Sequence, residues 1–394
     1  MIKRYLPYSR QNIDDKDIGE IVKVLKSDFI TQGPNIINFE KNFAKYVGAK
    51  YAVACATGTA ALHLSCIALG INKKSKILTS AVTFVASANC AEFLGADVDF
   101  VDIDKKTYCI SVSELEKKLK RRKIDLVIPV HLCGHSSDMA EIYKLKKKYN
   151  FHIIEDSCHA LGGTYNNFKV GSCKYSDIST FSFHPVKPIT TAEGGMITTN
   201  NKKIYEKLLL YRTHGIHKNT NFFKNKKLAF DENNKPNRWY YEMDVLGYNY
   251  RITDLQAALG NSQLKKIDKF TKRRNQIANF YNKNFSKLEN LIIPNKSKKI
   301  KHAYHLYTIL INFKKIKITK NNLMKNLMEI GIGSQVLYIP VFLQPYYKKK
   351  YSYRAKDFPQ SMKYYEQALS IPIFYGLLKK EQDFIIKKIK RLLS

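Results

Sequence analysis

Lys187 lies in a sequence context that differs from that of most lysines in this chain. It occupies a turn between two prolines, after a strand that ends at 184–185, and apolar residues and threonines flank it, whereas many other lysines stand in polar runs such as 146–148. A lysine amine can bond to a carbonyl carbon when its pKa is lowered, and desolvation beside a cation lowers it. Lys187 is therefore a candidate nucleophile, and a solvated surface charge is the alternative.

A second candidate group, Glu155 to His159, follows the strand run 152–154. An acidic side chain at a buried strand end is costly unless it has a cationic partner, and a protonated ring nitrogen is such a partner. Asp156 could instead be the N-cap of a helix. His159 equally fits a half-buried histidine whose hydrogen bonds are satisfied. The segment is therefore a candidate site with a plain structural alternative.

Two further segments have residue types that suit contact with an anion. Residues 56–60 (ATGTA) follow a predicted strand and begin a helix, where free backbone N–H groups and hydroxyls can bind phosphate. Ser182, five residues before Lys187, could also reach a phosphate. Residues 247–251 (GYNYR) place an Asn and an Arg in a turn before a helix. Ordinary helix caps at Thr57, Thr59 or Thr253 are the alternatives.

Strands and helices alternate over the part of the chain that carries these segments. This alternation predicts a mainly parallel sheet covered by helices on both faces, with ligands at the carboxyl ends of the strands. The predicted strands are 51–55, 76–79, 98–101, 126–130, 152–155, 178–183 and 195–199. The predicted helices between them are 58–69, 85–94, 112–118 and 139–149. We expect the four candidate segments to lie where this sheet places its strand ends.

The flanking regions are predominantly helical in pattern. Apolar residues recur at helical spacing, and the expected helices are 14–26, 39–47, 253–268, 270–285, 321–330 and 381–393, with a strand at 304–311. The polar segment 218–240 predicts a long surface loop. We expect a large domain over 1–260, whose N-terminal segment contacts a smaller C-terminal α+β domain over 261–394.

The composition of the chain argues against several classes of protein. The chain has 394 residues and a net charge of +34, but its lysine runs are short and scattered. No RNA-type aromatic motif or zinc-finger spacing accompanies them, so we expect no nucleic-acid partner. Seven cysteines without a CxxC pair argue against a disulfide framework and a structural zinc site. No signal peptide or membrane span is apparent. We expect a cytoplasmic protein without a metal.

The motifs taken together resemble one family. They are TQGP (31–34), ATGTAAL, FVDID (100–104), EDSCHALG, SFHPVKPITTAEGG, RTHGI and GYNYRITDLQAALG. The chain resembles the DegT/DnrJ/EryC1/StrS family of sugar aminotransferases over nearly its whole length. The resemblance implies the pyridoxal-phosphate (PLP)-dependent transferase fold type I, in which a mainly parallel seven-stranded sheet has helices on both faces.

The resemblance also implies a role for individual residues. Lys187 would be the Schiff-base lysine and proton shuttle, and Asp156 would pair with the pyridine nitrogen of the cofactor. The remaining cofactor contacts would come from Thr59, Ala60, Phe84, His159, Ser182 and Asn249. The sugar nucleotide would contact Tyr8, Thr31, Ser182, Asn249 and Tyr338. Asn249 would come from the neighbouring subunit, which implies a homodimer with shared active sites.

Within the family, FHPVKPITTAEGG is most similar to the transaminases of the pseudaminic acid pathway. This similarity implies L-glutamate as amino donor and a UDP-linked 4-keto-6-deoxy-N-acetylhexosamine as acceptor. The chain departs from the family at Leu337 and Phe342, where a His is common in a region that meets substrate. These departures bear on which sugar is the substrate. They do not change the residues that are expected to carry out the amination.

Three alternatives remain beside this interpretation. A sugar 3-dehydratase of the same family has His in place of the Schiff-base lysine, and Lys187 argues against it. A sister aminotransferase would make another amino sugar of the perosamine, bacillosamine or 3-amino type. A non-catalytic binding protein could keep the fold, but the presence of Lys187, Asp156 and Ser182 together argues against that class.

Overall fold

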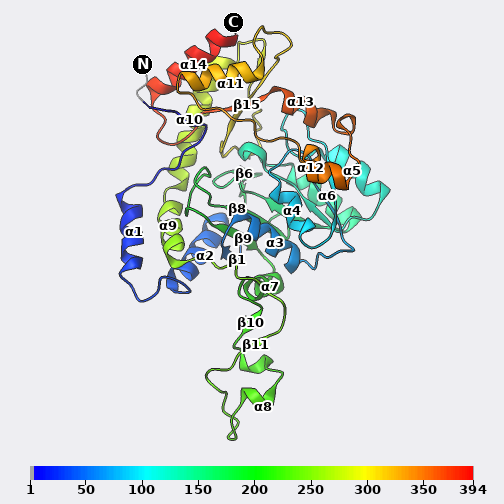
Figure 1. Ribbon diagram of the computed structural model, residues 1–394, viewed down its shortest axis with the longest axis vertical. Helices are drawn as coiled ribbons and strands as arrows, with labels where there is room; N and C mark the ends of the chain where they lie inside the picture. Colours follow the sequence, from blue (N-terminus) through cyan, green and yellow to red (C-terminus); the bar gives the residue numbers. More distant parts are fainter. Residues whose placement is uncertain (1–3, 394) are drawn as a thin grey trace.

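The computed structural model describes residues 4–393, and a seven-stranded sheet forms its centre (Figure 1). The strand order is β1-β9-β8-β5-β4-β2-β3. The strands are β1 (Tyr51–Cys55), β2 (Lys76–Ser80), β3 (Asp97–Val101), β4 (Leu126–Ile128), β5 (His152–Asp156), β8 (Ile178–Ser182) and β9 (Gly195–Thr199). Only β9 is antiparallel to its neighbours in this sheet. The expected mainly parallel sheet is confirmed.

The antiparallel orientation of β9 has a simple cause in the connection that precedes it. Residues 183–194, which include Lys187, join β8 to β9 without a helix. A parallel neighbour needs a crossover of a dozen or more residues, usually a helix, whereas a direct turn returns the chain antiparallel. The turn therefore stays at the carboxyl end of β8.

Helices cover both faces of the sheet because successive side chains of its strands point to opposite faces and are apolar on each. Ile77 and Ile154 pack with one group of helices, while their neighbours Leu78 and Ile153 pack with another. The first face carries α3 (Gly58–Ala68), α4 (Ala86–Glu92) and α7 (Lys202–Arg212). The second carries α2 (Pro34–Val47), α5 (Val112–Arg121), α6 (Met139–Tyr149) and α9 (Asp254–Leu264). Continuous burial of this kind is typical of parallel strands.

A second core lies around the three-stranded sheet β12-β14-β15. Its elements are α10 (Ile267–Phe285), β12 (Leu291–Ile292), β14 (Tyr307–Ile311), α11 (Lys320–Glu329), β15 (Ala368–Ile371) and α14 (Lys379–Leu393). Leu6 is buried in this core, so the N-terminal segment contacts it. Helix α10 packs into both cores, through Phe270 in the first and Tyr281 in the second. The boundary at residue 260 stays a prediction.

Several smaller elements complete the described chain. They are α1 (Asp15–Leu25), η1 (Leu132–Gly134), β6 (Thr164–Tyr165), β7 (Phe168–Lys169), β13 (Ile300–Lys301), η3 (Val341–Leu343), α12 (Pro345–Lys350), η4 (Ala355–Asp357) and α13 (Pro359–Gln367). Helix α2 begins five residues before its expected start, because Pro34 is pre-organised for the first turn of a helix. No helix within residues 4–393 is long and apolar enough to cross a membrane.

Residues 214–248 form an arm that projects from the body at the bottom of Figure 1. Its base is the two-stranded ladder of β10 (Ile216–His217) and β11 (Glu242–Met243). Beyond the ladder lie η2 (Thr220–Phe222) and α8 (Lys226–Ala229). The expectation of a plain loop over 218–240 is therefore corrected. The polar pattern hid short elements that local caps stabilise, such as the Asn225 side chain accepting from the Leu228 N–H.

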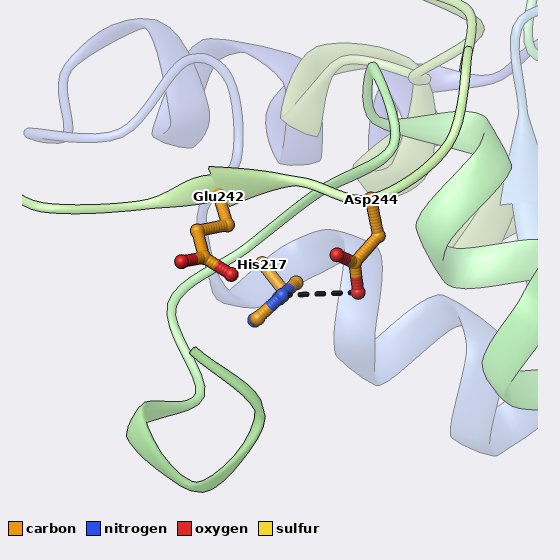
Figure 2. Close-up of side chains that lie close together, drawn as sticks. All are labelled: His217, Glu242 and Asp244. Atoms are coloured by element: carbon orange, nitrogen blue, oxygen red, sulfur yellow. Dashed lines mark ion pairs between the residues drawn. The ribbon is translucent and has the colours of Figure 1, made fainter. Parts of the chain in front are cut away.

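A charged cluster at the base of the arm holds this ladder together (Figure 2). His217, Glu242 and Asp244 could together ligate a metal ion. The Glu242 carboxylate, however, accepts hydrogen bonds from the backbone N–H groups of Lys224 and Asn225, both at 2.8 Å. The ammonium group of Lys224 lies 2.8 Å from Asp244. The Glu242 carboxylate is thus already hydrogen-bonded by backbone donors and Asp244 is already paired with Lys224, so protein groups alone account for this cluster.

Candidate active site

One cavity of about 490 Å³ lies at the carboxyl ends of the parallel strands. It brings together eight of the eleven residues singled out from the sequence, although they come from widely separated segments. These eight are Tyr8, Thr59, Phe84, Asp156, His159, Ser182, Lys187 and Tyr338. The other three, Thr31, Ala60 and Asn249, do not line it.

Lys187 is held half-buried in the turn between β8 and β9. Its backbone N–H donates to the His184 carbonyl at 2.8 Å, and the Ser9 hydroxyl donates to the Val186 carbonyl at 2.9 Å. Its amine makes no hydrogen bond or ion pair with any residue that the structure describes. Burial lowers the pKa of Lys187, while the nearby Cys158 and Asp156 oppose that shift. The amine is thus unpaired and closer to its nucleophilic form.

Asp156 is the last residue of β5 and is 6% exposed. Its Oδ2 accepts from the Ser87 hydroxyl at 2.6 Å, and its Oδ1 accepts from the Cys158 N–H at 3.2 Å. Within residues 4–393 it has no ion-pair partner. A buried carboxylate of this kind favours a cation on the cavity side, which a protonated ring nitrogen would provide.

The His159 side chain is fixed in one tautomer by its neighbours. Its Nδ1 accepts from the Cys133 N–H at 3.3 Å, so the ring proton lies on Nε2, which is 3.1 Å from the Tyr338 hydroxyl. Burial and the charge of Lys187 lower the pKa of His159 well below its usual value. The ring is therefore neutral. The Phe84 ring, 54% exposed, lies 5.8 Å from the Tyr338 ring and forms the outer wall.

The start of α3 lies against Ser182 at the cavity wall and offers donors that could hold an anion. Thr57 is the N-cap and accepts from the Ala60 N–H at 3.0 Å, so this N–H is already used. The N–H groups of Gly58 and Thr59 have no partner among the described residues. A Cβ on Gly58 would lie 2.7 Å from the Ser182 Cβ, so glycine permits this close approach. The N–H groups of Gly58 and Thr59, together with the hydroxyls of Thr59 and Ser182, are suitable donors for a phosphate group.

Thr31 and Asn249 are both exposed and lie in extended backbone bridges, to Thr253 and Thr213 respectively. Their expected contacts with cofactor or substrate are not formed within one chain. Leu337 lines the cavity, but Phe342 is fully buried and stacks on Phe358 at 4.3 Å. The expectation that position 342 meets the substrate is therefore corrected, because its side chain fills the core beneath α12.

Sequence reasoning missed Thr83 and Ser87, whose hydroxyls lie 2.8 Å apart beside Asp156. Thr83 lies three residues before α4 and Ser87 lies in its first turn, four residues further along the chain, and Ser and Thr hydroxyls at a helix start commonly hydrogen-bond to nearby groups. That spacing could have suggested a hydrogen-bonded pair. Nothing in the sequence indicates which strand end the pair faces.

The residues of the cavity fit PLP. An unpaired amine with a lowered pKa suits covalent attachment of its aldehyde, and the buried Asp156 carboxylate suits a protonated pyridine nitrogen. The cradle of Gly58, Thr59 and Ser182 suits its phosphate. Three separate groups of the cofactor thus meet complementary side chains or backbone in one cavity.

Comparisons with known proteins agree with this assignment. The model of the DegT/DnrJ/EryC1/StrS aminotransferase family matches residues 11–390. The chain is 40% identical over 390 residues to the uncharacterised Methanocaldococcus jannaschii protein MJ1066, covering 99% of this chain and 98% of that protein. It is 39% identical to the Campylobacter jejuni UDP-4-amino-4,6-dideoxy-N-acetyl-beta-L-altrosamine transaminase, covering 98% and 99%. It is 32% identical to the Escherichia coli O157:H7 GDP-perosamine synthase, covering 99% of each.

Solved structures give the same fold. Helicobacter pylori PseC, an aminotransferase involved in the biosynthesis of pseudoaminic acid, superposes with a TM-score of 0.89 at 29% identity, covering 99% of each chain. Streptococcus pneumoniae Spr1654 in its PLP form superposes with a TM-score of 0.86 at 26% identity, covering 99% and 100%. The expected fold type is confirmed.

Proposed function

Because the chain belongs to the DegT/DnrJ/EryC1/StrS aminotransferase family, we propose that it transfers the amino group of L-glutamate to C4 of a UDP-linked 4-keto-6-deoxy-N-acetylhexosamine. Membership makes the chain a PLP-dependent sugar aminotransferase. The observation that carries the proposal is the unpaired Lys187 amine in the same cavity as the buried Asp156 carboxylate.

The reaction divides among residues of the cavity. Bound PLP supplies an aldehyde that exchanges amines and a protonated ring that withdraws electrons. Lys187 would anchor the cofactor and then, as a free amine, take the proton from Cα of glutamate and pass it to the cofactor carbon that had carried the aldehyde. In the return half it would deliver a proton to C4 of the sugar. Its lowered pKa suits general-base catalysis, which contributes about 10²- to 10⁴-fold.

Other residues would position the reactants. The Gly58 and Thr59 N–H groups and the Ser182 hydroxyl would bind the phosphate. Neutral His159 would donate from Nε2 within the cavity, and Tyr8 and Tyr338 would border the sugar. Glutamate leaves as 2-oxoglutarate, and the keto sugar leaves as the amino sugar.

The choice of sugar is supported by similarity to the Campylobacter jejuni and Helicobacter pylori proteins. The 32% identity to a GDP-perosamine synthase supports the alternative of a sister aminotransferase on another keto sugar. A panel of UDP-, dTDP- and GDP-linked keto sugars with glutamate, monitored by 2-oxoglutarate formation, distinguishes them. Turnover of the UDP-linked 4-keto sugar supports the proposal, whereas exclusive turnover of a GDP or dTDP sugar contradicts it.

We also propose a homodimer in which Asn249 of one subunit completes the active site of the other. Within its own chain Asn249 is exposed and outside the cavity. The arm beside it exposes large apolar side chains, including Leu246 at 80% and Trp239 at 75%, which a partner would cover. The seven free thiols support a cytoplasmic location.

Subunit mixing tests the shared site. Lys187→Arg and Asn249→Ala homodimers should each be inactive. An equimolar mixture of the two should regain about one quarter of wild-type activity, because random pairing makes half of the dimers mixed and each mixed dimer has one intact site of two. A mixture that stays inactive, or a monomer in light scattering, contradicts the shared site.

A further inference from the structure

Two hydroxyl groups connect the cavity wall to the Asp156 carboxylate. Ser87 is fully buried, and its Oγ lies 2.6 Å from Asp156 Oδ2 and 2.8 Å from Thr83 Oγ1. An ionised carboxylate can only accept hydrogen bonds, so Ser87 must donate its proton to Asp156. Ser87 Oγ then has only acceptor capacity left, and Thr83 must donate to it. The direction of both hydrogen bonds is thereby fixed.

We propose that Ser87 and Thr83 are positioning residues that fix the orientation of the Asp156 carboxylate toward the cofactor ring. The inference rests on the proposed PLP chemistry at Asp156 and adds residues that act through it. Ser87 does not line the cavity, so its effect on a bound ring would be indirect.

The geometry explains why this carboxylate needs such support. The backbone of Asp156 is fixed, because its N–H donates to the Pro129 carbonyl at 2.9 Å and its own carbonyl accepts from His131. The terminal torsion of an Asp side chain is broad, so the carboxylate plane is set by hydrogen bonds and not by rotamer preference. Oδ1 accepts from the Cys158 N–H and Oδ2 accepts from the Ser87 hydroxyl, while the Cys158 thiol also interacts with the carboxylate.

Removal of the Ser87 hydroxyl would therefore remove its hydrogen bond to Oδ2 and leave the carboxylate plane held mainly by Cys158. Only the part of this hydrogen bond's contribution that differs between the free and the loaded protein affects cofactor affinity. Residues that hydrogen-bond to the ligands of a bound metal typically contribute about 10- to 100-fold to its affinity, which sets the scale for a supporting residue of this kind. We expect the PLP dissociation constant of Ser87→Ala to rise about 10-fold.

The test measures PLP binding to cofactor-free protein by absorbance titration, together with its melting temperature. Ser87→Ala should weaken PLP about 10-fold while the protein stays folded, and Ser87→Thr should restore affinity because it keeps the hydroxyl. Ser80→Ala is the matched control, since Ser80 is equally buried but its hydroxyl has no partner among the described residues. Its PLP affinity should be unchanged.

Several results would overturn the inference. Equal PLP affinity of Ser87→Ala and wild type does so, as does an equal loss in Ser80→Ala, which would indicate a general packing effect. Should Ser87→Ala not fold, Thr83→Val and Thr83→Ser make the same test, and only Thr83→Val should weaken PLP. A wild-type protein that fails to bind PLP at Lys187 would instead refute the proposed function itself.

Discussion

Gly58→Ala should disrupt the phosphate cradle at the start of α3. The added Cβ would lie 2.7 Å from the Ser182 Cβ and 3.3 Å from its Cα, where ordinary contact begins at 3.4 Å. Because the Ser182 Cβ is attached directly to β8, no rotation of that side chain removes the overlap. The start of α3 must move away from β8 by at least 0.7 Å to restore contact.

The displacement has two measurable consequences. Overpacking of a buried contact costs about 1–3 kcal/mol, so cofactor-free Gly58→Ala should melt a few degrees below wild type. A misplacement of about 1 Å costs on the order of 10²-fold in turnover, so 2-oxoglutarate formation should fall by that factor. PLP affinity, measured by absorbance titration, should fall with it.

Gly19→Ala is the matched control for the same added methyl group. Gly19 lies in α1, and nothing lies within 4 Å of the Cβ position. Alanine in a helix interior is favoured over glycine by about 0.5–1 kcal/mol, so this variant should be slightly more stable and bind PLP normally. A Gly58→Ala protein with wild-type PLP affinity and melting temperature would refute the reasoning about the cradle.

Three further predictions follow from the cavity. Asp156→Asn should lower turnover by about 10³-fold, as loss of a preorganised charge does, and near-wild-type formation of 2-oxoglutarate would contradict the role of the carboxylate. The pKa of Lys187 is lowered in the folded protein, so the unfolded chain binds more protons between that pKa and 10.5. The free energy of unfolding of the cofactor-free protein should therefore rise with pH within that window. This rise should be absent below the window, and it should be absent at every pH in Lys187→Met. Urea unfolding at several pH values measures this free energy. The same dependence of the free energy of unfolding on pH in wild type and Lys187→Met would contradict the prediction. Leu337→His should change the kcat/KM ratio between two keto sugars by about 10-fold while leaving PLP affinity unchanged, and an unchanged ratio would show that position 337 does not contact the sugar.

The sequence predicts much of the central sheet because buried parallel strands and their helices leave strong apolar patterns. Candidate side chains placed just after strand ends must converge at one edge of the sheet, and for this reason the strand pattern alone groups Asp156, Ser182 and Lys187. The resemblance to the family indicates which reaction these residues carry out, whereas their spacing alone does not.

Other features depend on tertiary packing, which local sequence patterns do not predict. The Ser87 hydroxyl meets Asp156 only because α4 and β5 are brought together across the sheet. Phe342 has an apolar side chain that suits a cavity wall as well as a core, and only packing against Phe358 decides between them. The arm over 214–248 owes its short helix to caps and ion pairs, which hydrophobic periodicity does not detect.

The most direct test of the account identifies the lysine that carries the cofactor. Borohydride reduction of the PLP-loaded protein locks the cofactor onto that lysine, and peptide mass mapping then locates it. We predict the label on Lys187, with the visible absorbance of the loaded protein lost in Lys187→Arg. A label on any other lysine, or a Lys187→Arg protein that keeps both its colour and its turnover, would contradict the account.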